Sequence, residues 1–155
     1  FDSYLHGGDQ EQKKRAGTEN LAAIIGMVAA LKEDLEKQEE HFQHVQNLET
    51  AFLAKLEGVQ YYLNRGEHHL PYVLNIGFPG QKNDLLLLRL DLAGISISTG
   101  SACTAGIVQS SHVLEAMYGA NSERLKESVR ISLSPENTVE DLHTLAKTLK
   151  EIIGG

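Results

Sequence analysis

The spacing of the apolar residues changes at Gly58, and this change constrains the fold more than any other feature of the chain. Between Thr18 and Gly58 apolar side chains recur at helical spacing, and no proline or glycine interrupts residues 27–57. This spacing predicts one long kinked helix, or two helices joined end to end. Beyond Gly58 apolar and polar residues alternate, which is typical of strands. The sequence therefore predicts helices and strands together.

The second part of the chain is expected to hold three or four short strands. The expected strands cover residues 59–63, 72–76, 95–98 and 129–133, and the expected helices cover about 83–92, 110–118, 122–128 and 138–153. Asn83 is expected to cap the helix at 83–92, and Gly94 to end it. We therefore predict an α/β (α+β) domain, with mostly antiparallel strands packed with helices.

The composition restricts the possible function classes. The formal net charge of −7 argues against a nucleic-acid-binding protein, because that class usually carries a basic surplus. No stretch approaches the ~18 apolar residues that a membrane-spanning helix requires. The single cysteine excludes an internal disulfide and fits a reducing compartment, so we expect a cytoplasmic protein.

Cys103 is the first candidate for chemistry. It follows the strand expected at 95–98, and no bulky side chain occurs between Thr99 and Gly106. We expect residues 99–108 to form a mobile, exposed loop, because little apolar burial would offset the entropy lost on ordering. A thiol on such a loop can swing toward a substrate. The alternative is that this lone cysteine is a small buried hydrophobe.

Arg130 is the second candidate, and it lies in the strand expected at 129–133. Alternation turns Val129 and Ile131 to one face of that strand, and Arg130 and Ser132 to the other. An arginine between small serines can present its planar guanidinium to a carboxylate in two parallel hydrogen bonds. The alternative is an ordinary solvated arginine. We expect Arg130 to face the same open side as the loop of Cys103, away from the helices.

Thr18 is the third candidate, because it stands where the first helix is expected to begin. Free N–H groups and the positive end of the helix dipole attract anions at such a position. The Thr18 hydroxyl could donate to a phosphate, or Thr18 could simply cap the helix. The seven histidines show no metal-ligand spacing with Cys103 or with one another, so we expect no metal site.

Three motifs follow one another along the chain: HGGDQE at 6–11 with RAGTEN at 15–20, STGSACTAG at 98–106, and SVRISL at 128–133. They resemble the GGGQE…RSGTEN, SSGSACTSG and SxRxSLG motifs of the NifS/IscS-type cysteine desulfurases, in the class-V aminotransferase fold family. The order and the separations agree, and the resemblance covers essentially the whole chain. The sequence departs from the family pattern at Asp9, Ala16 and Tyr72.

The resemblance implies a pyridoxal-phosphate enzyme that takes sulfur from L-cysteine and releases alanine. By the same resemblance, Cys103 is the nucleophile that becomes a persulfide, and Arg130 binds the α-carboxylate of the substrate. Thr18 would reach the cofactor phosphate of the neighbouring subunit in a homodimer. The implied sulfur acceptor is a protein such as an iron–sulfur scaffold or a tRNA-thiolation enzyme.

The resemblance also concerns what lies before the first motif. In the family, the lysine that binds the cofactor stands upstream, in a serine-histidine-lysine segment, with the large cofactor-holding domain before it. No lysine of this chain stands in such a segment. We therefore expect residues 1–17 to trail from the large domain, and residues 18–155 to form the small C-terminal domain of a fold-type I pyridoxal-phosphate enzyme, inactive by itself. The alternatives are a stand-alone sulfur carrier or binding module that uses Cys103 without the cofactor, and a structural fragment that dimerises through its N-terminal helices.

Overall fold

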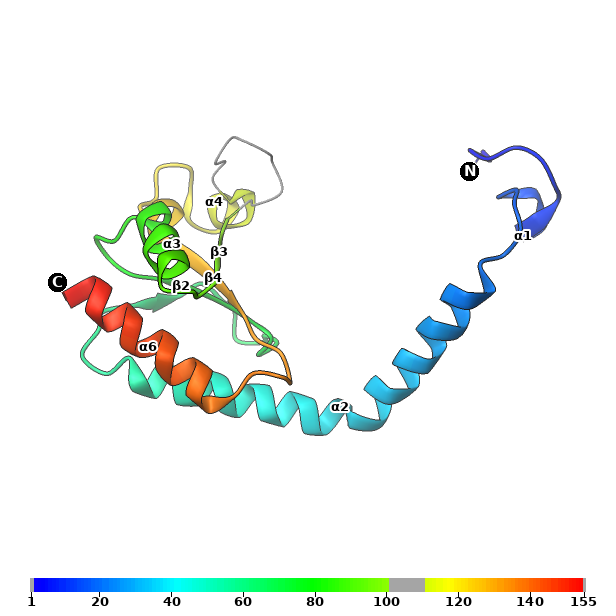
Figure 1. Ribbon diagram of the computed structural model, residues 1–155. Coiled ribbons are helices and arrows are strands. Elements are labelled where there is room, and N and C mark those ends of the chain that lie inside the picture. The colour runs from blue at the N-terminus through cyan, green and yellow to red at the C-terminus, as the bar shows by residue number, and fades with distance from the viewer. Residues whose placement is uncertain (1, 101–110, 155) are drawn as a thin grey trace. The chain divides into compact units, whose positions relative to one another are not determined.

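A computed structural model describes residues 2–100 and 111–154, and the chain divides into two compact units, Phe1–Gln38 and Glu39–Gly155. The long helix α2 (Leu21–Lys55) contributes residues to both units (Figure 1). The expected kinked or double helix is thus a single run of 35 helical residues. The boundary expected after residue 17 stays a prediction.

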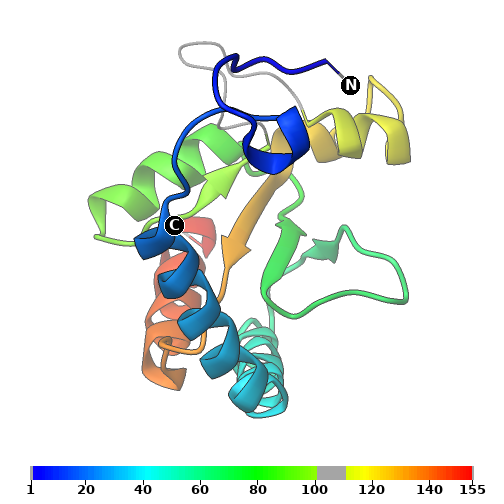
Figure 2. The same cartoon turned by 90° about the vertical axis from the view of Figure 1, so that its right-hand side faces the viewer.

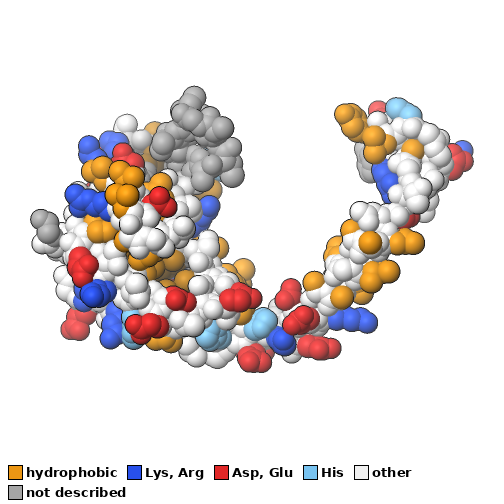
Figure 3. Space-filling view, viewed as in Figure 1, with side chains coloured by type: hydrophobic (Ala, Val, Ile, Leu, Met, Phe, Trp, Pro, Cys, Tyr) orange, Lys and Arg blue, Asp and Glu red, His pale blue; other side chains and the backbone are white. Residues whose placement is uncertain are grey.

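The first unit contains the short helix α1 (Gln10–Lys13) and the beginning of α2. Three successive residues of this region, Glu11, Gln12 and Lys13, have φ values of 51°, 54° and 65°. L-residues rarely adopt this left-handed conformation, and no sequence pattern predicted the turn. The part of α2 in this unit exposes several large apolar side chains (Figure 3): Leu21, Ile24, Ile25, Met27, Val28, Leu31 and Leu35.

The second unit is built on a four-stranded antiparallel sheet with the strand order β1-β2-β4-β3 (Figure 2). Its strands are β1 (Tyr62–Leu63), β2 (Val73–Gly77), β3 (Ser98–Thr99) and β4 (Ser128–Ser132). Its further helices are α3 (Asn83–Leu92), α4 (His112–Tyr118), α5 (Arg124–Glu127) and α6 (Val139–Gly154). The predicted fold class is confirmed.

One face of the sheet carries the hydrophobic core. Apolar side chains of β2 and β4 pack there against α2, α3 and α6. Leu74 and Ile76 come from β2, and Val129 and Ile131 from β4, each with at most 5% of its surface exposed. The residues between them on the strands consequently lie on the opposite face, which we call the open face.

Two expected strands are shorter than predicted, and helix ends explain why. Gly94 ends α3 with a φ of 77°, and the N–H of Ile95 donates to the carbonyl of Leu90 at 2.9 Å. This is a helix-ending turn in which glycine tolerates the left-handed backbone and the next apolar residue packs back. Likewise, the N–H of Val59 donates to the carbonyl of Leu56 at 2.9 Å. Residues 95–97 and 59–61 therefore belong to turns and connections.

The predicted cap at Asn83 is wrong. Lys82 occupies the cap position of α3 and makes no side-chain capping bond. The Asn83 side chain instead donates to the carbonyls of Leu125 and Ser128, at 3.2 and 3.1 Å. This amide therefore bonds to two carbonyl groups distant in the sequence and not to the backbone of its own helix.

Among the described residues, none of the helices is long and apolar enough to cross a membrane.

Candidate functional site

Arg130 lies in the middle of β4, on the open face of the sheet. Val129 and Ile131 beside it are buried in the core, whereas Arg130 is half-buried. Its Nε donates to the hydroxyl oxygen of Ser98 at 3.0 Å, on the neighbouring strand β3. Its two terminal nitrogens have no hydrogen-bond partner among the described residues. The guanidinium is therefore held at one edge and free to bind an anion at the other.

The strand register places Arg130 in a row of polar residues that crosses the sheet. Arg130 pairs with Asn75 of β2 on one side and with Ser98 of β3 on the other. Asn64 extends the row, because its N–H donates to the carbonyl of Asn75 at 2.9 Å. Alternation had placed Arg130 on this face, but the sequence did not indicate its neighbours.

Asn64 is a buried hydrogen-bonding centre beside this row, with 8% of its surface exposed. Its Nδ2 donates to Asn75 Oδ1 at 2.9 Å and to Ser128 Oγ at 2.8 Å. Its Oδ1 accepts from Arg124 Nη1 at 3.0 Å. Every polar atom of the Asn64 side chain is thus used within the protein, so Asn64 fixes its neighbours and does not itself bind a ligand.

Arg124 lies against two aromatic rings. Its guanidinium carbon lies 4.1 Å from the ring centre of Tyr62 and 4.3 Å from that of Tyr118, which is cation–π geometry with each ring. The Tyr62 ring in turn lies over Gly77, its register partner, where any Cβ would collide with it. Arg124 is consequently a fixed hydrogen-bond donor, and no sequence pattern had singled it out.

Tyr62 links Arg124 to the connection after β2. Its hydroxyl donates to Glu127 Oε2 at 3.1 Å, and Glu127 Oε1 accepts from the N–H of Gly80 at 2.7 Å. Burial is the main cause that raises the pKa of Tyr62 to about 12, and the neighbouring Glu127 raises it as well. Tyr62 therefore stays protonated at neutral pH and keeps donating to Glu127.

A cavity of about 620 Å³ opens beside the end of β3. Thr99, Gly100 and Ser111 line one part of it, Asn83 and several residues between 120 and 126 line the rest, and Arg130 is not among its described lining residues. Cys103 and most of the loop expected at 99–108 lie outside the described residues. The structure thus describes both ends of the segment that contains Cys103, and both ends line this cavity.

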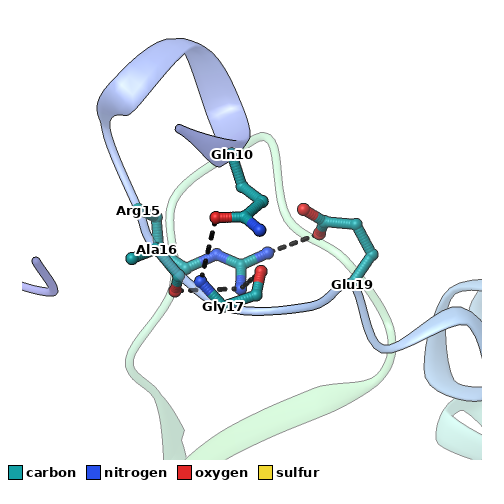
Figure 4. Close-up of polar contacts among 5 residues, drawn as sticks. All are labelled: Gln10, Arg15, Ala16, Gly17 and Glu19. Carbon is teal, nitrogen blue, oxygen red and sulfur yellow. Dashed lines mark hydrogen bonds and ion pairs between the residues drawn. The ribbon is translucent and has the colours of Figure 1, made fainter. Parts of the chain in front are cut away.

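Thr18 belongs to the first unit, in a turn that a network of side chains holds together (Figure 4). Arg15 Nη1 donates to the carbonyl of Gly17 at 3.0 Å, and Arg15 also pairs with Glu19. The N–H of Gly17 donates to Gln10 Oε1 at 3.2 Å. Residues before and after Thr18 thus take part in this network, and the Thr18 side chain does not.

The N-cap of α2 is Asn20, and Thr18 does not serve as the cap. Asn20 Oδ1 accepts from the N–H of Ala23 at 3.1 Å, and α2 begins at Leu21. Thr18 is exposed, and its hydroxyl has no hydrogen-bond partner among the described residues. The capping alternative for Thr18 is therefore wrong, and the hydroxyl is available to a ligand.

In the same described ranges, no three His, Cys, Asp or Glu side chains are grouped as metal ligands would be.

Comparison with known proteins gives the family. The aminotransferase class-V family model matches residues 3–145. The chain belongs to this family.

Individual relatives agree with this assignment. The chain is 45% identical over 152 residues to the "Putative cysteine desulfurase IscS 1" of Bacillus subtilis, and 35% identical over 159 residues to the "Cysteine desulfurase NifS" of Azotobacter vinelandii. These matches cover 96% and 99% of this chain, but only 40% and 39% of the relatives. The solved structure of a NifS-like protein from Rickettsia africae matches with a TM-score of 0.83 and 30% identity, over 99% of this chain and 40% of that one. The chain thus spans about two fifths of the length of these relatives.

Proposed function

We propose that this chain is the C-terminal part of a pyridoxal-phosphate-dependent cysteine desulfurase. Its contribution would be the substrate-binding arginine and the cysteine that accepts sulfur from L-cysteine. The observation that carries the proposal is Arg130, half-buried on the open face, with terminal nitrogens that no described residue engages. Its partner Ser98 precedes Cys103 by only five positions in the sequence. The names of the relatives support the same activity.

In this proposal Arg130 binds the α-carboxylate of L-cysteine. The two terminal N–H groups of a guanidinium match the two oxygens of a carboxylate, and the Nε bond to Ser98 fixes the plane of the fork. Partial burial strengthens this interaction, because less water competes for the charge. The bound L-cysteine is then held by its α-carboxylate, and its thiol is free to react.

Cys103 would accept the sulfur. Its thiolate attacks Sγ of L-cysteine, the bond between Cβ and Sγ breaks, and Cβ takes up a proton. The products are alanine and a persulfide on Cys103, so all atoms and electrons are accounted for without a further oxidant or reductant. Pyridoxal phosphate supplies the electron sink that makes Cβ–Sγ cleavage possible when it is bound.

Thr18 would donate a hydrogen bond to the phosphate group of pyridoxal phosphate. Its hydroxyl is exposed and free of described partners, and it precedes the positive end of α2. Arg15 is paired with Glu19, so this segment offers a hydrogen-bond donor and little net charge. Thr18 would therefore be one donor among several, acting on the cofactor of a neighbouring subunit in a homodimer.

The proposed protein works in the cytoplasm and passes its persulfide sulfur to an acceptor protein. An iron–sulfur scaffold or a tRNA-thiolation enzyme would serve as the acceptor. The single cysteine supports this compartment, because a thiol that must be free to react persists where disulfides are rare.

A chimera tests the activity. This chain replaces the matching segment of the Bacillus subtilis relative, and alanine release from L-cysteine is measured with pyridoxal phosphate present. The proposal expects turnover that Cys103→Ser abolishes. A folded chimera that binds the cofactor and releases no alanine would contradict the proposal.

A further inference from the structure

Arg124 orients the side-chain amide of Asn64, and Asn64 in turn orients that of Asn75. A guanidinium can only donate hydrogen bonds, so the atom of Asn64 that faces Arg124 Nη1 at 3.0 Å must be the oxygen. The amide nitrogen of Asn64 consequently faces Asn75 and donates to it at 2.9 Å. The atom of Asn75 that receives this bond must then be its oxygen.

This order of donors and acceptors determines where the Asn75 amide nitrogen points. Because Oδ1 is turned toward Asn64, Nδ2 is turned away from it. Asn75 is half-buried, and its Nδ2 has no hydrogen-bond partner among the described residues. Asn75 is also the register partner of Arg130 on the open face, and directly paired residues have Cβ atoms about 4.5–5.5 Å apart. An unengaged amide donor therefore lies beside the unengaged terminal nitrogens of Arg130.

We propose that Asn75 is a second binding residue for the α-carboxylate of the substrate, and that Arg124 and Asn64 are the positioning residues that turn its amide nitrogen toward Arg130. The inference rests on the proposed function, which supplies the carboxylate. Arg130 gives two donors in one plane, and Asn75 adds a third from the neighbouring strand. A carboxylate has about four lone-pair sites, so it accepts all three.

The charges around the pair favour an anion. Arg130 and Arg124 both lie on this side of the sheet. Along the chain, the acidic residue next to Arg124 is Glu123, which is exposed and pairs with Lys126, and Glu127 lies three positions from each arginine. Glu127 already accepts hydrogen bonds from Tyr62 and from the N–H of Gly80. Its charge is therefore partly satisfied within the protein and competes little for Arg130 or Asn75.

Nuclear magnetic resonance of the ¹⁵N-labelled chain tests this inference without turnover. L-Alanine is the probe, because it is the stable product of the proposed reaction and carries the same α-carboxylate. We expect the Asn75 side-chain amide and Arg130 Nε–H resonances to shift together with one dissociation constant. A shift of Arg130 with no shift of the Asn75 amide, or no saturable shift of either, would overturn the assignment.

The Asn75→Asp variant sharpens the test. It keeps an oxygen for Asn64 but replaces the free donor with negative charge, so the alanine dissociation constant should rise at least about tenfold. The matched control is Asn47→Asp on the exposed surface of α2, which makes the same charge change and should alter the constant less than about twofold. Equal constants for the two variants would refute a contact between Asn75 and the carboxylate.

The positioning role has its own readout. Asn64→Asp presents only oxygens to Asn75, so the Asn75 amide should rotate and donate to position 64. The alanine-induced shift of the Asn75 amide should then disappear, while the backbone spectrum stays folded. Persistence of that shift would overturn the positioning role. Failure of the chimera to release alanine would instead count against the proposed function, so the two failures are distinguishable.

Discussion

Arg130 Nε donates a hydrogen bond to Ser98 Oγ at 3.0 Å, across the antiparallel pair of strands β4 and β3. The bond joins the strand of the candidate carboxylate-binding residue to the strand that leads toward Cys103. Any movement of β3 therefore acts on the orientation of the guanidinium. In the proposed enzyme, this contact couples substrate binding to the start of the sulfur-accepting segment.

Arg130→Lys in the chimera should raise the KM for L-cysteine by about tenfold or more, because an ammonium cannot supply the planar pair of donors. It also loses the Nε donor to Ser98. Steady-state kinetics with varied L-cysteine measure the effect, and Lys147→Arg on the exposed side of α6 is the control. An unchanged KM in Arg130→Lys would refute the assigned role.

Glu49 and Arg65 form an ion pair at the edge of the core, and this pair should contribute to stability. The Glu49 side chain is 7% exposed and that of Arg65 is 28% exposed. Arg65→Met leaves a buried carboxylate without its partner, so the free energy of unfolding should fall by about 2–3 kcal/mol, less than for a fully buried pair. Urea unfolding of the chain at neutral pH measures this change.

The control for that experiment is the exposed pair of Lys147 and Glu151 on α6. Lys147→Met should change the free energy of unfolding by less than about 0.5 kcal/mol, because exposed ion pairs contribute little. Equal effects of the two Met substitutions would show that burial of Glu49 does not make its pair important.

Local sequence patterns predicted those parts of the fold that depend only on residues close together in the sequence. Period-two alternation gave the face of Arg130, and Gly94 gave the end of α3. Patterns of this kind cannot give strand register, so the pairing of Arg130 with Asn75 and Ser98 was not foreseen. These contacts join segments more than 30 residues apart.

The wrong cap prediction at Asn83 and the rejected capping alternative for Thr18 have a similar cause. Asn83 and Thr18 are both good capping residues by type. Asn83 bonds instead to distant carbonyls, and Asn20 caps α2 because it directly precedes the first helical residue. No sequence pattern identified Arg124 as part of the site, because its aromatic partner Tyr62 lies on a different element. The predictions for Cys103 concern residues outside those described.

The chain of 155 residues should not catalyse the reaction by itself. None of its lysines stands in the serine-histidine-lysine segment of the family, so we expect no alanine from L-cysteine when pyridoxal phosphate is added. Cys103 should still react stoichiometrically with a thiol reagent in native conditions, because a thiolate needs only access for that exchange. Alanine turnover by the chain, or a thiol that reacts only after unfolding, would contradict this prediction.

The mass of the Cys103 peptide after reaction with L-cysteine tests most directly whether Cys103 accepts the sulfur. The chimera is treated with L-cysteine and pyridoxal phosphate, alkylated and digested. The mass of the peptide that contains Cys103 is then measured by mass spectrometry. We expect one added sulfur atom on this peptide in the parent chimera, and a reduced yield in Arg130→Lys at L-cysteine concentrations below the parent KM. A peptide of unmodified mass, while alanine is being released, would contradict the assignment of Cys103 as the sulfur acceptor.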